Sequence, residues 1–215
     1  MKVHFEKALL KLEGLLEDNT LRCGKAVASA VHAMAMDDIE EARMVQRNDA
    51  AIDVAENQIE EECLEILALY QPVAADLRWV VTILKANGEI ERAGDLAVNI
   101  ARAAEDTDDV NAREVWDFSE MSNKAVEMFS RALDALIKHN EKAARQIIAD
   151  DAAVDELHAA NRQRAAECLA ADPAGARYYL AALTVSYALE RLGDLATNIA
   201  EDVIYLETAE IVRHR

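Results

Sequence analysis

The sequence has few of the residues that interrupt helices or favour β-structure. It contains two prolines and six glycines in 215 residues, and aromatic residues make up 5% of it. Because Pro and Gly are the strongest helix breakers, long stretches of this chain can remain helical. Hydrophobic residues, chiefly Ala and Leu, reach 52%, which is enough for a sizeable core. The composition therefore predicts an all-α protein.

Basic residues are also scarce. The chain has 23 Lys and Arg against 41 Asp and Glu, which gives a net charge of −18. A surface of this sign repels the phosphates of nucleic acids and the headgroups of anionic membranes. It attracts cations and basic protein partners. We therefore expect no nucleic-acid partner.

The sequence shows neither a membrane segment nor a disulfide pattern. Its most suspicious apolar stretch, 178–189, is too short to span a bilayer, and no basic-then-apolar leader opens the chain. Cys23, Cys63 and Cys168 lie far apart and form no CxxC motif, which is typical of reduced core cysteines in cytosolic proteins. We expect a cytoplasmic protein without direct membrane insertion.

Two acidic motifs each occur twice in the chain. Residues 91–101 read ERAGDLAVNIA, and residues 190–200, 99 positions later, read ERLGDLATNIA. Residues 49–53 read DAAID, and residues 151–155, 102 positions later, read DAAVD. Each motif carries two carboxylates at i, i+4, which lie on one face of a helix. The sequence therefore predicts two structural repeats with equivalent acidic sites.

The positions of the helix breaks predict three helices in each repeat. Pro72 and Pro173 stop helices, and the polar segment 106–111 separates the two halves. The expected helices span about 3–36, 37–70, 73–105, 113–138, 141–171 and 174–207. Short connections between such long helices demand antiparallel packing. We therefore predict two tandem antiparallel three-helix bundles, residues 1–106 and 112–208, followed by a polar tail, 209–215.

Folding each half at its proline turn brings the acids to the same level. Asp49 with Asp95, and Asp53 with Glu91, are centred on position 72. The pairs of the second half are centred on the turn at 172–173, and they are Asp151 with Asp194 and Asp155 with Glu190. Two carboxylates about 5 Å apart repel by about 3 kcal/mol at an effective dielectric of about 20. Four carboxylates together therefore require protons or cations.

Carboxylate oxygens suit Mg²⁺, Ca²⁺, Mn²⁺ or carboxylate-bridged iron. We accordingly predict metal sites at Asp49, Asp53, Glu91, Asp95, Asp151, Asp155, Glu190 and Asp194. His158 could add a nitrogen ligand in the second half, although an ordinary surface role suits it better. Gly94 and Gly193 are expected to allow close helix approach. The plain structural alternative is that Arg92 and Arg191 simply neutralise solvated acids.

The ordered set of motifs resembles the PhoU family of regulators of bacterial phosphate uptake. Residues 71–78, QPVAADLR, are similar to the family's Q-P-x-A-x-D-L-R segment. The family's E/D-x-x-x-D signature corresponds to Glu91/Asp95 and to Glu190/Asp194. This sequence departs from the pattern at Ala188, which replaces the extra acid that Glu89 supplies in the first repeat.

The resemblance implies a cytoplasmic, non-enzymatic negative regulator that is often a homodimer. It implies an adaptor between the phosphate ABC transporter, through a PstB-like ATPase, and a PhoR-like sensor histidine kinase. It also implies iron, zinc, manganese or magnesium at the acidic motifs.

Two other functions stay open at this point. One is a carboxylate-bridged di-iron oxidase or storage protein, although such bundles use Glu-x-x-His and this chain has no such motif. The other is a metal-free helical scaffold. No nucleophile–base pair or Gly-rich phosphate loop is visible, so we expect no enzyme.

Overall fold

The computed structural model describes residues 2–107 and 116–208, and those residues form helices without any β-strand. The first repeat holds α1 (Lys2–Met36), α2 (Ile39–Asn48), α3 (Ala50–Tyr70) and α4 (Ala74–Glu105). The second holds α5 (Ser119–Ile137), α6 (Glu141–Ala171) and α7 (Ala176–Thr208), with a 3₁₀ turn at Pro173–Gly175. The all-α prediction is confirmed.

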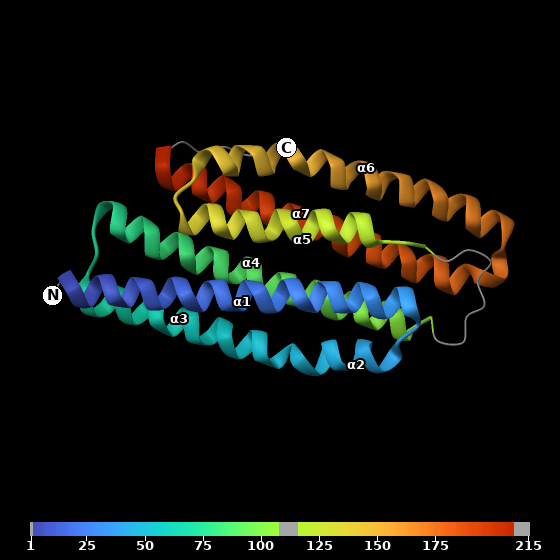
Figure 1. Ribbon diagram of the computed structural model, residues 1–215, viewed down its shortest axis with the longest axis horizontal. Helices are drawn as coiled ribbons and strands as arrows, with labels where there is room; N and C mark the ends of the chain where they lie inside the picture. Colours follow the sequence, from blue (N-terminus) through green and yellow to red (C-terminus); the bar gives the residue numbers. More distant parts are fainter. Residues whose placement is uncertain (1, 108–115, 209–215) are drawn as a thin grey trace.

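The helices form two antiparallel bundles that lie side by side, as Figure 1 shows. In the lower bundle of that view, the consecutive helices α2 and α3 run back along α1, and α4 then returns in the direction of α1. The upper bundle repeats this course with α5, α6 and α7. Because α2 and α3 follow one another as one bent rod, each repeat has the three-rod plan that the sequence predicts.

One expected helix is interrupted. The sequence predicts an unbroken helix over 37–70, but the structure divides it at Asp49. Asp49 keeps helical dihedral angles, φ −56° and ψ −41°, and its carbonyl accepts a hydrogen bond from Ile52 N–H at 2.8 Å. This i→i+3 bond is the tighter 3₁₀ pattern, which bends the rod without a proline or glycine.

The turns use residues that complete helix ends. Asp38 caps α2, because its Oδ1 accepts a hydrogen bond from Glu41 N–H at 3.0 Å. Gln71 adopts the left-handed region, φ 45°, and its N–H bonds to Leu67 O, which ends α3 before Pro72. The left-handed His139, φ 52°, lies in the expected turn between α5 and α6. These ends fix the two hairpins of each repeat.

The helix predicted over 113–138 begins later than expected. Its first three residues lie outside the described ranges, and 116–118 precede α5 as irregular chain. Trp116 and Phe118 are buried there, and Trp116 N–H donates a hydrogen bond to Tyr178 Oη at 2.8 Å. The Trp116 ring lies near Tyr179 of α7 and near Phe118, with ring centroids 6.5 Å and 6.0 Å apart.

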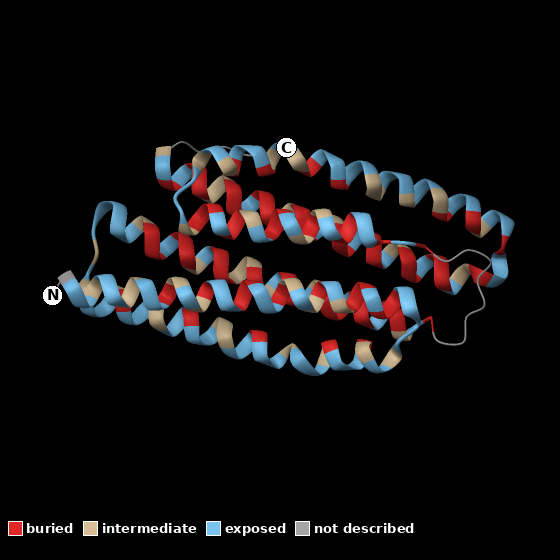
Figure 2. Ribbon diagram, viewed as in Figure 1, coloured by how far each residue is buried: buried red, intermediate tan, exposed pale blue. Residues whose placement is uncertain are grey.

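The core lies between the rods, with buried residues on the facing sides and exposed residues outside (Figure 2). Ile52, Ile59 and Ile66 of α3 are buried and recur at helical spacing on its inward face. Leu77, in the first turn of α4, is 41% exposed. All three cysteines are buried and reduced, and burial raises the pKa of the Cys23 and Cys63 thiols to about 12.

The two repeats pack against one another through α4 with α7 and α1 with α5. α4 and α7 run antiparallel along what we call the α4–α7 seam (Figure 1), and Lys85 Nζ pairs with Asp202 Oδ1 across it at 2.8 Å. No helix within 2–107 and 116–208 is long and apolar enough to cross a membrane. Most of the predicted linker and the whole tail 209–215 lie outside the described residues, so the domain boundaries stay a prediction.

Candidate metal sites

The structure brings the acids of the first repeat together where α3 faces α4. The pKa of Glu91 is raised by burial and then by the charges of Asp95, Glu56 and Asp53. The pKa of Asp49 is raised by burial and then by Asp53 and Asp95. These acids, which we call the first acidic cluster, are Asp49, Asp53, Glu56, Glu91 and Asp95. Asp49 Oδ1 would lie 3.3 Å from a Cβ at Gly94, next to Asp95, which agrees with the equal level expected for Asp49 and Asp95.

Glycine allows α4 to approach the α2–α3 junction. A Cβ added at Gly94 would lie 3.2 Å from Ile52 Cγ2 and 3.3 Å from Asp49 Oδ1. Both distances are tighter than ordinary van der Waals contact, so a side chain at this position would press on the cluster. The expected role of Gly94 in close helix approach is confirmed.

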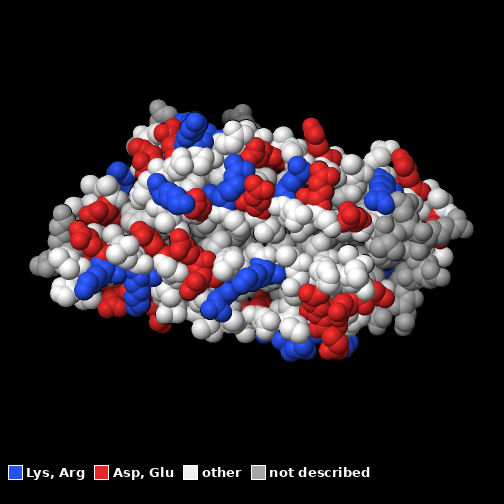
Figure 3. Space-filling view, in the orientation of Figure 1, with Lys and Arg blue, Asp and Glu red and all other residues white. Residues whose placement is uncertain are grey.

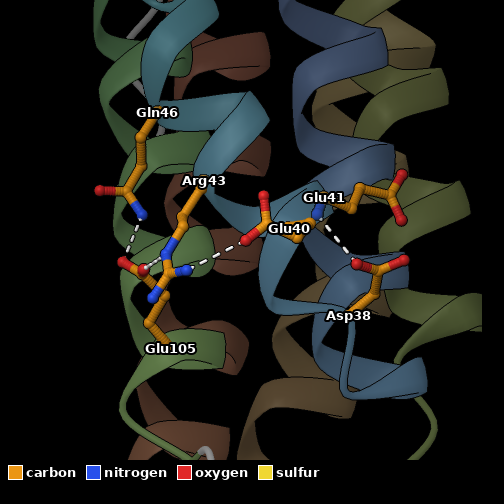
Figure 4. A network of polar contacts seen from close by, with 6 residues as sticks. All are labelled: Asp38, Glu40, Glu41, Arg43, Gln46 and Glu105. Carbon is orange, nitrogen blue, oxygen red and sulfur yellow. Dashed lines mark hydrogen bonds and ion pairs between the residues drawn. The ribbon is translucent and has the colours of Figure 1, made fainter.

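A polar network on the surface holds α2 against the end of α4 and so positions Asp49 (Figure 4). Arg43 Nε donates to Glu105 Oε1 at 2.9 Å, and Gln46 Nε2 donates to Glu105 Oε2 at 2.7 Å. Arg43 also pairs with Glu40 at 3.0 Å within α2. The network lowers the pKa of Glu105, because its carboxylate accepts bonds from Gln46 and Arg43.

The second repeat forms an equivalent group between α6 and α7. The pKa of Glu190 is raised by burial and then by Asp194, Asp155 and Asp151. These four residues are the second acidic cluster. Asp151 is buried in the middle of α6, and a Cβ at Gly193 would lie 2.8 Å from its Oδ1. The closest contact is therefore tighter here than at Gly94, although the next atoms, on Val154, lie at an ordinary 3.7 and 3.9 Å.

The donor set of both clusters fits a hard cation. In the second cluster, Glu190 Oε2 is buried and has no hydrogen-bond partner, which leaves a carboxylate oxygen available for a cation. As the side chains stand, however, no three His, Cys, Asp or Glu side chains within the described ranges are arranged to hold a metal ion. Metal binding at these eight residues therefore requires carboxylates to rotate, and it stays a prediction.

The arginines next to the motifs behave differently in the two repeats. Arg92 pairs with Glu89 at 2.9 Å, whereas Arg191 pairs with Asp194 at 3.5 Å. The alternative in which arginine neutralises the motif acids thus applies partly to the second cluster. The charge of Arg92 lowers the pKa of Glu91 but is a smaller influence than the surrounding acids.

Sequence reasoning placed two residues imperfectly. Glu56 belongs to the first cluster, since its charge raises the pKa of Glu91. The sequence indicates this by placing Glu56 on the same helical face as Asp49 and Asp53. His158 is half-buried rather than a surface residue: its Nδ1 lies 3.0 Å from Ser186 Oγ, and burial lowers its pKa. Asn161 Nδ2 donates to the same hydroxyl at 3.0 Å. Asn99 and Asn198, which follow the two E-R-x-G-D motifs by one helical turn, are exposed.

Comparison with known proteins agrees with the duplicated plan. A model of the PhoU domain matches this chain twice, over residues 21–104 and 118–203. The chain belongs to the PhoU family. It is 31% identical to the "phosphate-specific transport system accessory protein PhoU homolog 1" of Methanothermobacter thermautotrophicus, covering 97% of this chain and 96% of that protein. It is 33% identical to the PhoU homolog of Pseudomonas aeruginosa, covering 96% and 83%.

Solved PhoU structures have the same fold. PhoU from Pseudomonas aeruginosa superposes with a TM-score of 0.89 at 31% identity, covering 96% of this chain and 100% of that one. The phosphate transport system regulatory protein PhoU from Streptococcus pneumoniae also gives 0.89, at 27% identity, covering 98% and 100%. The family suggested by the motifs is therefore confirmed over nearly the whole chain.

Proposed function

We propose that this chain is a cytoplasmic negative regulator of phosphate uptake and phosphate-starvation signalling. It acts without catalysis, as an adaptor between a PstB-like ATPase of the phosphate transporter and a PhoR-like sensor histidine kinase. Family membership supports this role, because the similar proteins are named accessory or regulatory proteins of phosphate transport. The homodimeric state implied by the resemblance is part of the same proposal.

The observation that carries the mechanism is the duplicated acidic cluster. In each repeat, burial and then the charges of neighbouring acids raise the pKa of a motif glutamate, so a cation that binds there relieves the repulsion. The residues that would hold the cation are the eight predicted acids, with Glu56 added in the first repeat. Iron, zinc, manganese or magnesium would neutralise the cluster and link α3 to α4, or α6 to α7. Cation binding would thereby fix the surface that partners contact.

The test combines elemental analysis of gently purified protein with partner binding. The variant is Asp95→Asn with Asp194→Asn, and the matched control is Asp18→Asn with Glu127→Gln, one exposed acid from each repeat outside the clusters. We expect stoichiometric metal in the wild type and the control, and its loss in a variant with unchanged circular dichroism. Equal absence of metal after dialysis against Mn²⁺, Fe²⁺, Mg²⁺ and Zn²⁺ would remove the metal from the proposal.

Docking is measured separately, by titrating the purified ATPase and the kinase's cytoplasmic part into the three proteins. We expect the acid-neutralised variant to bind at least one partner about tenfold more weakly than the control, a change of about 1.4 kcal/mol. Unchanged binding by the neutralised variant would favour the metal-free scaffold. Absence of binding to either partner, even by wild-type protein loaded with metal, would overturn the adaptor role.

A further inference from the structure

A groove opens between the two repeats at one end of the α4–α7 seam. It has a volume of about 480 Å³ and lies where the end of α4 meets the start of α7. Its lining includes Asn99 and Arg102 of α4 and, on α7, Arg177, Leu180, Thr184 and Tyr187. This volume falls within the range of sites for small molecules. We call it the inter-repeat groove, and its lining includes none of the acids of the two clusters.

Two arginines enter the groove from opposite repeats. Arg177 contacts Asp106 Oδ1 at 3.9 Å, and both side chains are mostly exposed, so the pair adds little. Arg102 makes no hydrogen bond or ion pair with any residue in the described part of the chain, although its charge lowers the pKa of Asp49. On the face shown in Figure 3, Lys and Arg lie interspersed among Asp and Glu. The groove thus concentrates positive charge in a chain whose net charge is −18.

The repeat-equivalent end of the seam is built differently. There, Lys85 and Asp202 form an ion pair across α4 and α7 at 2.8 Å. Moving each of these positions by one repeat of 99 residues gives Thr184 and Ala103, which cannot form an ion pair. By the same shift of 99 residues, the position equivalent to Arg102 in the second repeat holds Glu201. The end of the seam where the groove lies therefore has no equivalent of this ion pair, and Arg102 differs in charge from its repeat equivalent Glu201.

The groove also has an apolar wall. Leu180 is 56% exposed and Tyr187 is 54% exposed, although both are large and lie on the central helix α7. One side of the Tyr187 ring packs near His158, with ring centroids 6.2 Å apart. An exposed ring in the same groove as two guanidinium groups can contact a planar or apolar group while the arginines hold an anion.

We propose that the inter-repeat groove binds a small phosphate monoester. Arg102 and Arg177 bind the phosphoryl group, because planar guanidinium groups match phosphate oxygens with paired N–H donors. The Asn99 amide is placed to add a donor, and the organic portion lies against Leu180 and Tyr187. Inorganic phosphate shares the phosphoryl chemistry but would leave the apolar wall empty, so a nucleoside monophosphate suits the groove better.

The test is calorimetric titration of the full chain with AMP, inorganic phosphate and sulfate, after treatment with EDTA. We expect saturable AMP binding that is tighter than phosphate binding, and sulfate binding no tighter than that of phosphate. Arg102→Gln and Arg177→Gln should each weaken AMP about tenfold or more. Arg145→Gln, an equivalent change at an exposed arginine on α6, should have no effect. Asp106→Asn should tighten binding, because it releases Arg177.

Two further variants make the result decisive. Tyr187→Ala should weaken AMP and leave phosphate unchanged, and equal AMP affinity in this variant would overturn the apolar part of the assignment. Asp95→Asn with Asp194→Asn should keep AMP binding, which separates this site from the acidic clusters of the proposed function. The proposal is overturned if AMP and phosphate both fail to bind at millimolar concentration, or if the two arginine variants bind as the wild type does.

Discussion

The first acidic cluster carries five carboxylates and the second carries four, although both lie beside the same E-R-x-G-D motif. The extra acid is Glu56, whose repeat-equivalent position holds His158. In the first repeat, Arg92 is paired with Glu89, while in the second, where Ala188 replaces that glutamate, Arg191 pairs with the motif acid Asp194. The first cluster is therefore the more anionic, and we expect it to bind a cation more tightly.

The polar residues next to the two clusters also differ between the repeats. Asn87 Nδ2 donates to the Glu56 carbonyl at 2.9 Å, and the equivalent Ser186 bonds to the His158 ring instead. Asp49 sits at a bend between two helices, whereas Asp151 is buried inside the continuous helix α6. Duplication has thus kept the positions of the acids while changing their charge balance and their rigidity.

The largest expected effect on stability comes from cation binding at the two clusters. At Mn²⁺ concentrations one hundred times Kd, the metal should raise the free energy of unfolding by about 2.7 kcal/mol for each site that binds only the folded protein. Asp95→Asn should remove more of this stabilisation than Asp194→Asn at low Mn²⁺. Thermal unfolding with and without EDTA measures it, with Asp18→Asn as the control. A larger loss in Asp194→Asn would reverse the order of the two clusters.

The glycines give the next largest effect. Alanine at Gly193 should destabilise the protein by about 1 kcal/mol, because overpacking against the buried Asp151 exceeds the gain in helix propensity. Alanine at Gly94 should change stability by less than about 0.5 kcal/mol, since its closest contacts are looser and Asp49 is half-buried. Urea unfolding followed by circular dichroism compares the two. Equal effects would mean that the two helix contacts are equally tight.

The pH dependence should be the same in both repeats. Burial and three neighbouring acids raise the pKa of Glu91 and of Glu190 above 4.5, so the folded chain binds protons more readily than the unfolded chain. Their contribution to stability is full below about pH 4.5 and is lost as pH rises through the folded-state pKa. In EDTA, the urea midpoint of the wild type should fall as the pH rises above 4.5. Glu91→Gln and Glu190→Gln should each make this fall smaller. An unchanged slope in either variant would show that its glutamate is not repelled.

The smallest effect concerns the arginines. Replacing Arg191 with Gln removes a positive charge from Asp194 and should tighten Mn²⁺ binding at the second cluster by a few-fold, under about 1 kcal/mol. Arg92→Gln should change the Mn²⁺ affinity of the first cluster less, because the Arg92 guanidinium is already paired with Glu89. Calorimetric titration of each variant measures the affinities. If Arg92→Gln gives the larger gain, the pairing with Glu89 does not shield the cluster.

The sequence was most informative where a chemical constraint acts locally. Pro72 and Pro173 must end helices, and this alone set the two hairpins and the level of the acids on either side of them. The i, i+4 spacing then placed the carboxylates on facing sides, which their mutual effects on pKa confirm. The metal itself could not be inferred with the same force, because carboxylates of this spacing also occur without one.

Features set by tertiary contacts were harder to predict. The bend at Asp49 has no proline or glycine, and it depends on contacts from α2 to Glu105 that lie far away in the sequence. Arg78 and Arg177 stand 99 positions apart and so occupy equivalent places in the two repeats. Arg177 pairs with Asp106, whereas Arg78 keeps a buried Nε without a hydrogen bond in the described structure. The inter-repeat groove was also not predictable from the sequence, since it depends on how α4 and α7 pack against one another.

The shortness of α2 has a consequence for cooperativity. A ten-residue helix is not stable in isolation, and α2 buries only Ala42 and Val45 while surface polar contacts hold it in place. Its backbone amides should therefore exchange with deuterium faster than those of α6, through local openings that leave α3 intact. The first repeat thus has a separable unit ending at a cluster acid, and the second repeat, with one continuous helix, has none within its described residues.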